Sequence, residues 1–187
     1  AKNIKTVLEK NKLDGIDLDF EWAENEKEYK DYSLAILKMR EVLGNKYLFS
    51  VSLHPVCYKI SKEAIEAVDF ISLQCYGPSP VRFPIEKYCS DIQMVLEYGI
   101  PKEKLVAGVP FYGVTKDNSK KTEAYFNFVQ NGLVTSPAQN EVIYQGDTYV
   151  FDGQDNIRIK TRYAKEQKLK GMMSWDLATD LPLSDSR

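Results

Sequence analysis

The sequence predicts an α/β protein in which parallel strands alternate with helices. Short apolar runs alternate with amphipathic stretches along the chain, and glycine or proline stands at several of the boundaries between them. Strands that are separated by helices in the sequence are joined by right-handed crossovers and therefore run parallel. The 187 residues, 43% apolar and 28% charged, suffice for one globular domain with its own core.

The first four expected elements are a helix, a strand, a helix and a strand. Residues 2–12 carry apolar side chains on one helical face, and residues 15–22 alternate in polarity as a strand does. Across residues 26–43 apolar side chains recur at helical spacing, and Gly44 follows as a stop signal. The apolar run 47–53 is the second strand.

The middle of the chain repeats this order. Residues 61–67 form a short helix with a serine at its start, and residues 70–76 form a strand that a Gly-Pro turn signal ends. Residues 85–98 form an amphipathic helix that a glycine ends. The strand 105–109 follows and stops at a proline.

The last third departs from strict alternation at one point. We expect a helix over residues 122–131 and then a hairpin of strands 141–144 and 148–151 around a Gln-Gly-Asp turn. A helix over residues 155–168 and a final strand at 171–175 restore the alternation.

Two architectures fit this order, a doubly wound sheet and an eight-stranded barrel. A doubly wound nucleotide-binding sheet carries a glycine-rich loop after a strand, and the sequence has neither a GxGxxG nor a Walker motif. A barrel has eight strands in roughly 250 residues. This chain offers five such strands, so the barrel interpretation implies that about three strand–helix units lie outside it.

Composition excludes several classes of function. A net charge of −2 without a basic stripe argues against a nucleic-acid partner, and no apolar run is long enough to cross a membrane. Three cysteines do not make a disulfide framework. His54 is the only histidine, which argues against a zinc site or a Ser-His-Asp triad, and we expect a structural or loop-lining role for it and not a catalytic one.

The strand 15–22 carries the chemistry. Because a strand alternates faces, Asp17, Asp19 and Glu21 share one face and leave apolar side chains on the other. Burying such a row costs desolvation and like-charge repulsion, which raises the pKa of at least one member. A carboxyl that keeps its proton near neutral pH is what a general acid needs, and Glu21 is nearest the carboxyl end of the strand. A metal site and a solvated polar face are the two alternatives.

Residues 14–21, DGIDLDFE, resemble the DGxDxDxE signature of glycoside hydrolase family 18, the chitinases and endo-β-N-acetylglucosaminidases. Residues 68–76, 105–113 and 171–176 resemble the sixth, seventh and eighth strand segments of that family in the same order. The resemblance implies a (β/α)8 TIM barrel of which residues 1–187 are one segment, with strands four to eight. Strands one to three would belong to an N-terminal remainder of about 100 residues.

The resemblance also implies a role for four catalytic side chains. Glu21 would protonate the glycosidic oxygen while the N-acetyl carbonyl of the substrate attacks the anomeric carbon, a retaining mechanism assisted by the substrate. Asp19 would orient the acetamido group, and Asp17 would share a proton or a hydrogen bond with Asp19. Tyr76 would donate its hydroxyl to the acetamido oxygen.

Four further side chains are expected to bind the sugar. Trp175 would form a floor under it, because a flat ring covers the C–H face of a sugar well. Gln74, Tyr112 and Trp22 would also reach the cleft. Many family members carry Met, Tyr and Asp where this sequence has Gln74, Tyr76 and Gly77.

The expected substrate is chitin or a chitooligosaccharide, cleaved at β-1,4 bonds next to N-acetylglucosamine. The alternatives are an endo-β-N-acetylglucosaminidase that acts on N-glycan cores and a non-catalytic chitin-binding lectin. We expect no cofactor and no metal ion, and a secreted or periplasmic protein by analogy with the family. The small domain that some members insert after the seventh strand is expected to be absent, with only a hairpin at 141–151 in its place.

Overall fold

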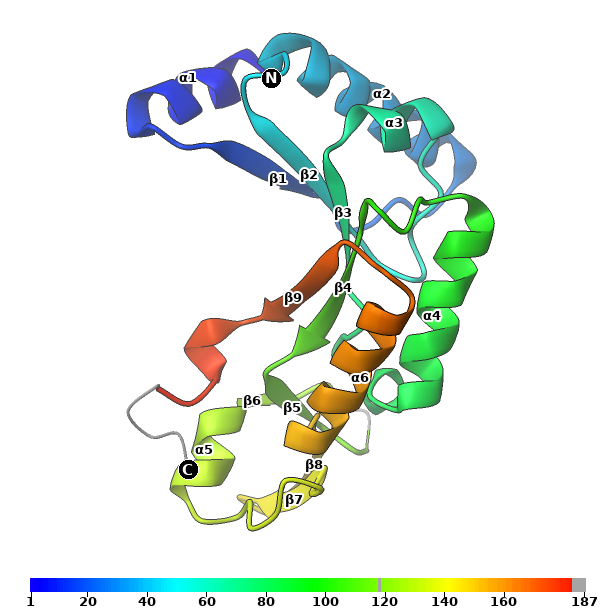
Figure 1. Ribbon diagram of the computed structural model, residues 1–187. Helices are drawn as coiled ribbons and strands as arrows, with labels where there is room; N and C mark the ends of the chain where they lie inside the picture. Colours follow the sequence, from blue (N-terminus) through cyan, green and yellow to red (C-terminus); the bar gives the residue numbers. More distant parts are fainter. Residues whose placement is uncertain (118, 183–187) are drawn as a thin grey trace.

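A parallel five-stranded sheet forms the centre of the computed structural model, which describes residues 1–117 and 119–182 (Figure 1). The strands lie in the order β1-β2-β3-β4-β9, which is the order of the sequence, and every neighbouring pair is parallel. Their bounds are β1 Gly15–Asp19, β2 Leu48–Leu53, β3 Phe70–Leu73, β4 Leu105–Pro110 and β9 Gly171–Trp175. The predicted α/β fold with parallel strands is therefore confirmed.

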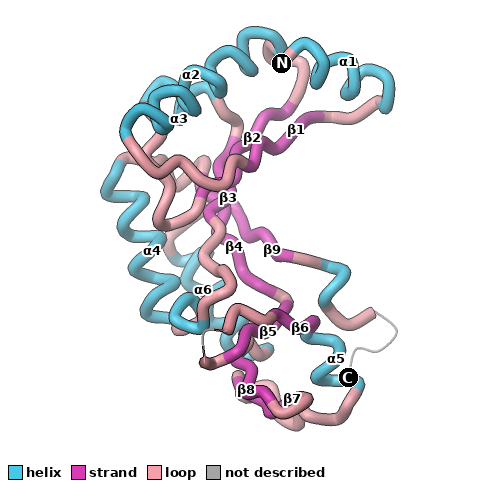
Figure 2. Tube along the Cα trace, turned by 180° about the vertical axis from the view of Figure 1, so that it is seen from behind, coloured by secondary structure: helices cyan, strands magenta, loops and turns pink. Residues whose placement is uncertain are grey.

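Helices lie on the outer side of this curved sheet, as both views show (Figures 1 and 2). The helices that join the parallel strands, together with the first helix of the chain, are α1 Lys2–Asn11, α2 Glu26–Leu43, α3 Lys62–Ala67, α4 Ile85–Tyr98 and α6 Gln154–Glu166. Asn25 caps α2 by accepting a hydrogen bond from the Glu28 backbone N–H at 3.1 Å, and Ser61 caps α3 in the same way. Gly99, with φ at 111°, ends α4 in a left-handed conformation that favours glycine.

The two faces of the sheet differ in chemistry. Phe49, Val51, Ile71 and Leu73 are fully buried in the core beneath the helices. Ser50 and Ser52 on β2 and Ser72 on β3 alternate with these residues and face away from that core. The sheet thus turns an apolar face to its helices and a polar face to its open side.

A second, antiparallel unit follows β4, and here the sequence-based expectation was wrong. A four-stranded sheet in the order β6-β5-β8-β7 packs with α5 around its own apolar cluster. Its elements are β5 Tyr112–Thr115, β6 Thr122–Ala124, α5 Tyr125–Gln130, β7 Glu141–Tyr144 and β8 Asp147–Val150. The predicted hairpin is its outer half, while β5 and β6 replace part of the expected loop and helix. The segment after β4 therefore holds a small antiparallel sheet with its own apolar cluster and not only the expected hairpin.

The parallel sheet ends at β1 and β9, and neither strand pairs with a further parallel strand within the described residues. None of the helices in the described part of the chain combines the length and the apolar character that crossing a membrane requires. Which strands of a complete barrel these five represent remains a prediction.

Candidate active site

A pocket of about 820 Å³ lies where the carboxyl ends of the parallel strands meet. Such ends are where enzymes of parallel α/β architecture place their chemistry. All eight side chains that the sequence indicated line this pocket: Asp17, Asp19, Glu21, Trp22, Gln74, Tyr76, Tyr112 and Trp175. These eight predicted residues come from the segments of β1, β3, β4 and β9, and none of them comes from β2.

The acidic row comes from β1 and from the residues just after it. β1 ends at Asp19, so Glu21 lies beyond the strand and not at its last position. All three residues keep much of their solvent exposure and their carboxylates are only partly buried, which corrects the expectation of a buried row. The reason is that β1 is an edge strand here, with β2 as its only neighbour within the described residues.

Two serines of β2 hold Asp17. The hydroxyls of Ser50 and Ser52 donate to the two carboxylate oxygens of Asp17 at 2.5 and 2.7 Å. The register of β1 on β2 aligns Asp17 with Ser50 and Asp19 with Ser52. The expected hydrogen bond between Asp17 and Asp19 is therefore replaced by these serine contacts.

Gln74 links the other two acids. Its amide nitrogen donates to Oδ1 of Asp19 at 3.2 Å and lies 3.5 Å from Oε1 of Glu21. Partial burial, and then the charges of Glu21 and Asp17, raise the pKa of Asp19, while the Gln74 bond opposes that rise. The expectation that one member of the row has a raised pKa is confirmed for Asp19.

Tyr76 projects into the same pocket from the segment after β3. Burial raises the pKa of its hydroxyl, which therefore keeps its proton and can donate it to an acceptor. That hydroxyl lies 3.6 Å from the sulfur of Met173 on β9. Gly108 on β4 makes room for the ring, because a Cβ at this position would lie 2.9 Å from Cε1 of Tyr76. Tyr112 packs its ring edge-to-face on Tyr76, with ring centroids 6.3 Å apart.

Two tryptophans stand at the rim of the pocket. Trp175 is the last residue of β9 and is 56% exposed, so its ring is available as a flat apolar surface. Trp22 follows Glu21 directly and is 37% exposed. Its ring meets that of His54 at a centroid distance of 4.8 Å.

Sequence reasoning missed the polar residues that β2 adds. Ser50, Ser52 and His54 occupy alternate positions on and just after β2 and line the pocket, although none was assigned to it. The sequence contains a pattern that could have identified them, because polar residues at every second position of an otherwise apolar strand indicate a polar face.

Within the described residues, no group of three His, Cys, Asp or Glu side chains is placed to hold a metal ion.

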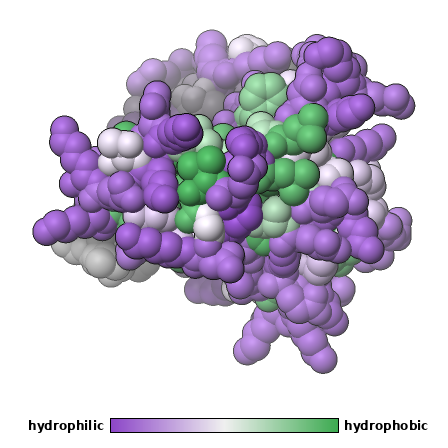
Figure 3. Space-filling model, turned by 90° about the horizontal axis from the view of Figure 1, so that it is seen from above, coloured by the Kyte–Doolittle hydropathy of each residue, from purple (hydrophilic) through white to green (hydrophobic). Residues whose placement is uncertain are grey.

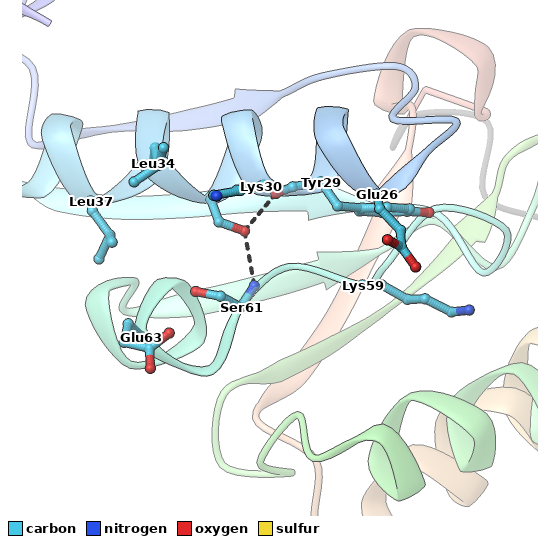
Figure 4. Close-up of a pocket in the computed structure, with 9 residues that line it drawn as sticks. Glu26, Tyr29, Lys30, Leu34, Leu37, Lys59, Ser61 and Glu63 are labelled. Atoms are coloured by element: carbon cyan, nitrogen blue, oxygen red, sulfur yellow. Dashed lines mark hydrogen bonds between the residues drawn. The ribbon is translucent and has the colours of Figure 1, made fainter.

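A second pocket, of about 510 Å³, lies on the outer surface between α2 and the segment that leads into α3 (Figure 4). Leu34 and Leu37 line it, and the Ser61 backbone N–H donates to Ser33 at 2.9 Å across its floor. Figure 3 looks onto the end that carries α1 and α2 and shows hydrophobic side chains gathered in its middle. Figure 4 places Glu26 and Glu63 toward opposite ends of this pocket, so it has no acidic row.

Comparison with known proteins supports an assignment by family. The family model of glycosyl hydrolases family 18 matches residues 1–180. Probable chitinase 2 of Drosophila melanogaster is 23% identical over 96% of this chain and 50% of its own length. Class V chitinase of Arabidopsis thaliana is 25% identical over 76% of this chain and 48% of its own length. The chain therefore spans about half the length of these relatives.

Solved structures show the same fold. The GH18 chitinase ChiB of Flavobacterium johnsoniae aligns with a TM-score of 0.77 and 28% identity over 96% of this chain and 59% of its own. A chitinase from Bacteroides thetaiotaomicron aligns with a TM-score of 0.84 and 21% identity over 98% of this chain and 63% of its own. With a family model that matches almost the whole chain, and with the acidic signature lining one pocket, this chain belongs to glycosyl hydrolases family 18.

Proposed function

We propose that the protein hydrolyses β-1,4 bonds next to N-acetylglucosamine in chitin or chitooligosaccharides. The observation that carries the proposal is that Asp17, Asp19 and Glu21 line one pocket whose rim holds Trp22 and Trp175. Carboxyl groups supply acid catalysis, and flat aromatic rings cover the C–H faces of sugars. The names of the relatives, which are chitinases, point to the same substrate class.

Glu21 is the proposed general acid. Asp19 and Glu21 both lie within reach of the amide nitrogen of Gln74, so their carboxyl groups are close together in the pocket. Glycoside hydrolases of family 18 are an exception to the scheme with two catalytic carboxylates, because the substrate itself supplies the nucleophile. From the family signature in residues 14–21 we assign the attack to the acetamido carbonyl of the substrate, with Asp19 orienting that group.

Tyr76 and Asp17 complete the proposed mechanism. The protonated Tyr76 hydroxyl would donate to the acetamido oxygen as charge develops there. Asp17 is held by two serines beside Asp19, and after burial and the charge of Glu21 it is the third contribution that raises the pKa of Asp19. Trp175 would form the floor of the site, and Tyr112 and Trp22 would border it.

A complete barrel is part of the same proposal. Val7 and Leu13 are exposed, and with Ile4 and Ile16 they line a largely apolar hollow of about 250 Å³ beside the free edge of β1. An unpaired edge strand with apolar neighbours is a surface that folded proteins usually cover. We propose that an N-terminal remainder of the polypeptide, strands one to three of the barrel, covers it.

The test uses the complete polypeptide and two pentasaccharides. Chitopentaose should be cleaved with release of the β-anomer, which proton NMR resolves, because attack by the acetamido group retains the configuration. Cellopentaose has the same β-1,4 linkage without the acetamido group and should stay intact. A high-mannose glycopeptide in a parallel reaction tests the endoglycosidase alternative. Binding of chitopentaose without cleavage would contradict the proposal and favour a lectin.

A further inference from the structure

His54, the only histidine of the sequence, sits at the junction of three segments that carry site residues. It follows β2 directly, is buried, and lines the pocket. Its ring contacts Trp22, the residue after Glu21, and its Nε2 lies 3.0 Å from the carbonyl oxygen of Tyr76. One side chain therefore touches the segments that follow β1 and β3.

The hydrogen bonds of the ring define its chemical form. The Tyr76 carbonyl can only accept, so Nε2 carries the hydrogen and donates it. The Val56 backbone N–H can only donate, and it lies 3.3 Å from Nδ1, which must therefore accept. The imidazole is thus neutral and held from both sides.

The turn that carries His54 also holds the segment after Glu21. His54 and Cys57 close the turn by exchanging backbone hydrogen bonds, of which the one from Cys57 N–H measures 2.7 Å. The buried thiol of Cys57 accepts from the Ala23 N–H at 3.0 Å and lies 3.1 Å from the Ala23 carbonyl. His54 therefore contacts Trp22 and Cys57 binds Ala23, so one turn holds both residues that follow Glu21.

We propose that His54 is a positioning residue that holds the Trp22 ring at the pocket rim before sugar binds. The inference rests on the proposed function for the nature of the ligand, and on the contacts above for the restraint itself. Immobilising a side chain on binding costs free energy, and a ring that is already held avoids this cost. The neutral ring of His54 thus strengthens binding on the Trp22 side of the pocket without touching the reacting bond.

The experiment uses the fact that residues 1–187 contain only two tryptophans and one histidine. Residues 1–187 have two tryptophans, so Trp175→Phe, with any tryptophan outside these residues also replaced by phenylalanine, leaves Trp22 as the only emitter of tryptophan fluorescence. In that background, His54→Gln removes the ring and keeps an amide that can donate, whereas His54→Phe keeps a ring of similar shape. Acrylamide quenching and fluorescence anisotropy of Trp22, measured without sugar, should show a freer indole in His54→Gln and little change in His54→Phe.

A binding measurement connects the restraint to the sugar. In the protein with Trp175 intact, His54→Gln should weaken triacetylchitotriose binding by about 2- to 10-fold, the range that the cost of ordering one side chain allows. KM should rise with it, while kcat changes less, because the Glu21 carboxyl is not touched. His54→Phe should retain most of the affinity. A folded His54→Gln protein with unchanged Trp22 quenching and unchanged affinity would overturn the proposal.

A measurement on the native His54 covers the case in which the variants do not fold. When residues 1–187 of Trp175→Phe are isotope-labelled as a segment of the complete polypeptide, they contain one labelled histidine and one labelled tryptophan, so a nuclear Overhauser contact between labelled imidazole and indole protons can arise only from His54 and Trp22. Its presence supports the restraint, and its absence overturns it. Because neither this contact nor the quenching depends on hydrolysis, a protein that fails to cleave chitopentaose would refute the proposed function and leave this inference standing.

Discussion

The side-chain amide of Gln74 donates a hydrogen bond to Asp19 at 3.2 Å, although 55 positions separate the two residues in the sequence. This bond favours the charged form of Asp19 and opposes the burial and the neighbouring negative charges that raise its pKa. Gln74 therefore limits the rise in the pKa of Asp19.

Removing this amide should raise the pKa of Asp19 further. In Gln74→Leu the burial and the charges of Glu21 and Asp17 remain, while the bond that lowers the pKa is lost. Carbon-13 NMR of the aspartate carboxyl groups should show Asp19 titrating at higher pH than in the wild type. Gln93→Leu on the exposed face of α4, which removes an amide bonded to Glu97, is the matched control and should leave Asp19 unchanged.

Neutralising Asp19 should stabilise the fold at neutral pH. Folding raises the pKa of this carboxyl above its ordinary value of 3.8, so the native state binds the proton more tightly than the unfolded state. That stabilising contribution is fully present below pH 3.8 and is lost as the pH rises through the folded-state pKa. Asp19→Asn should therefore melt at a higher temperature than the wild type at pH 7, with the difference vanishing in acid. A variant that melts lower at pH 7 would contradict this electrostatic account.

The buried pair of Lys160 on α6 and Asp152 after β8 should be essential for stability. Both side chains are fully inaccessible to solvent, and Lys160 also lies over the ring of Tyr88. Lys160→Met leaves a carboxylate buried without its partner, which should cost about 3–5 kcal/mol in chemical denaturation.

Two further variants separate the charge effect from the loss of a lysine. Lys165→Met, at an exposed position of the same helix, should change the free energy of unfolding little. The double variant Lys160→Met, Asp152→Leu should recover part of the loss, since it removes both charges. Equal losses in Lys160→Met and Lys165→Met would refute the importance of the pair.

Shortening Trp175 should weaken sugar binding and leave the melting temperature nearly unchanged. The side chain is more than half exposed, so little packing is lost in Trp175→Ala. The loss of ring contact should lower triacetylchitotriose affinity by about 2- to 10-fold, with the about 0.5–1.5 kcal/mol of an aromatic pair taken as the scale for the contact of a ring with a sugar. Leu177→Ala, an even more exposed apolar residue that does not line the pocket, is the control for calorimetric titration. Equal affinities in the two variants would argue against a sugar floor at Trp175.

The sequence predicted the parts of the site that depend on the residue pattern within one strand and on the order of strands and helices. Alternation along one strand was enough to place Asp17, Asp19 and Glu21 on one face, and the crossover order brought Gln74 to the same edge of the sheet. The Ser50 contact with Asp17 could not be predicted with certainty, because it depends on the register between two strands.

The sequence analysis did not predict the antiparallel unit, and this larger error also has a physical cause. β5 pairs with β8, although the β6 and α5 segments lie between them in the sequence. Strands of three or four residues carry too few alternating positions for a clear pattern, and their pairing is decided by the distant partner. The apolar run in α5 predicted a helix correctly, but its start was placed in what is β6.

The most direct test of the account is the hydrolysis of chitopentaose by Glu21→Gln in the complete polypeptide. Removing a general acid should lower kcat by about 10²- to 10⁴-fold while oligosaccharide affinity stays close to that of the wild type. Glu24→Gln, three residues further and outside the pocket, should cleave normally. If Glu21→Gln turns over chitopentaose as fast as the wild type does, Glu21 is not the acid that breaks the sugar bond.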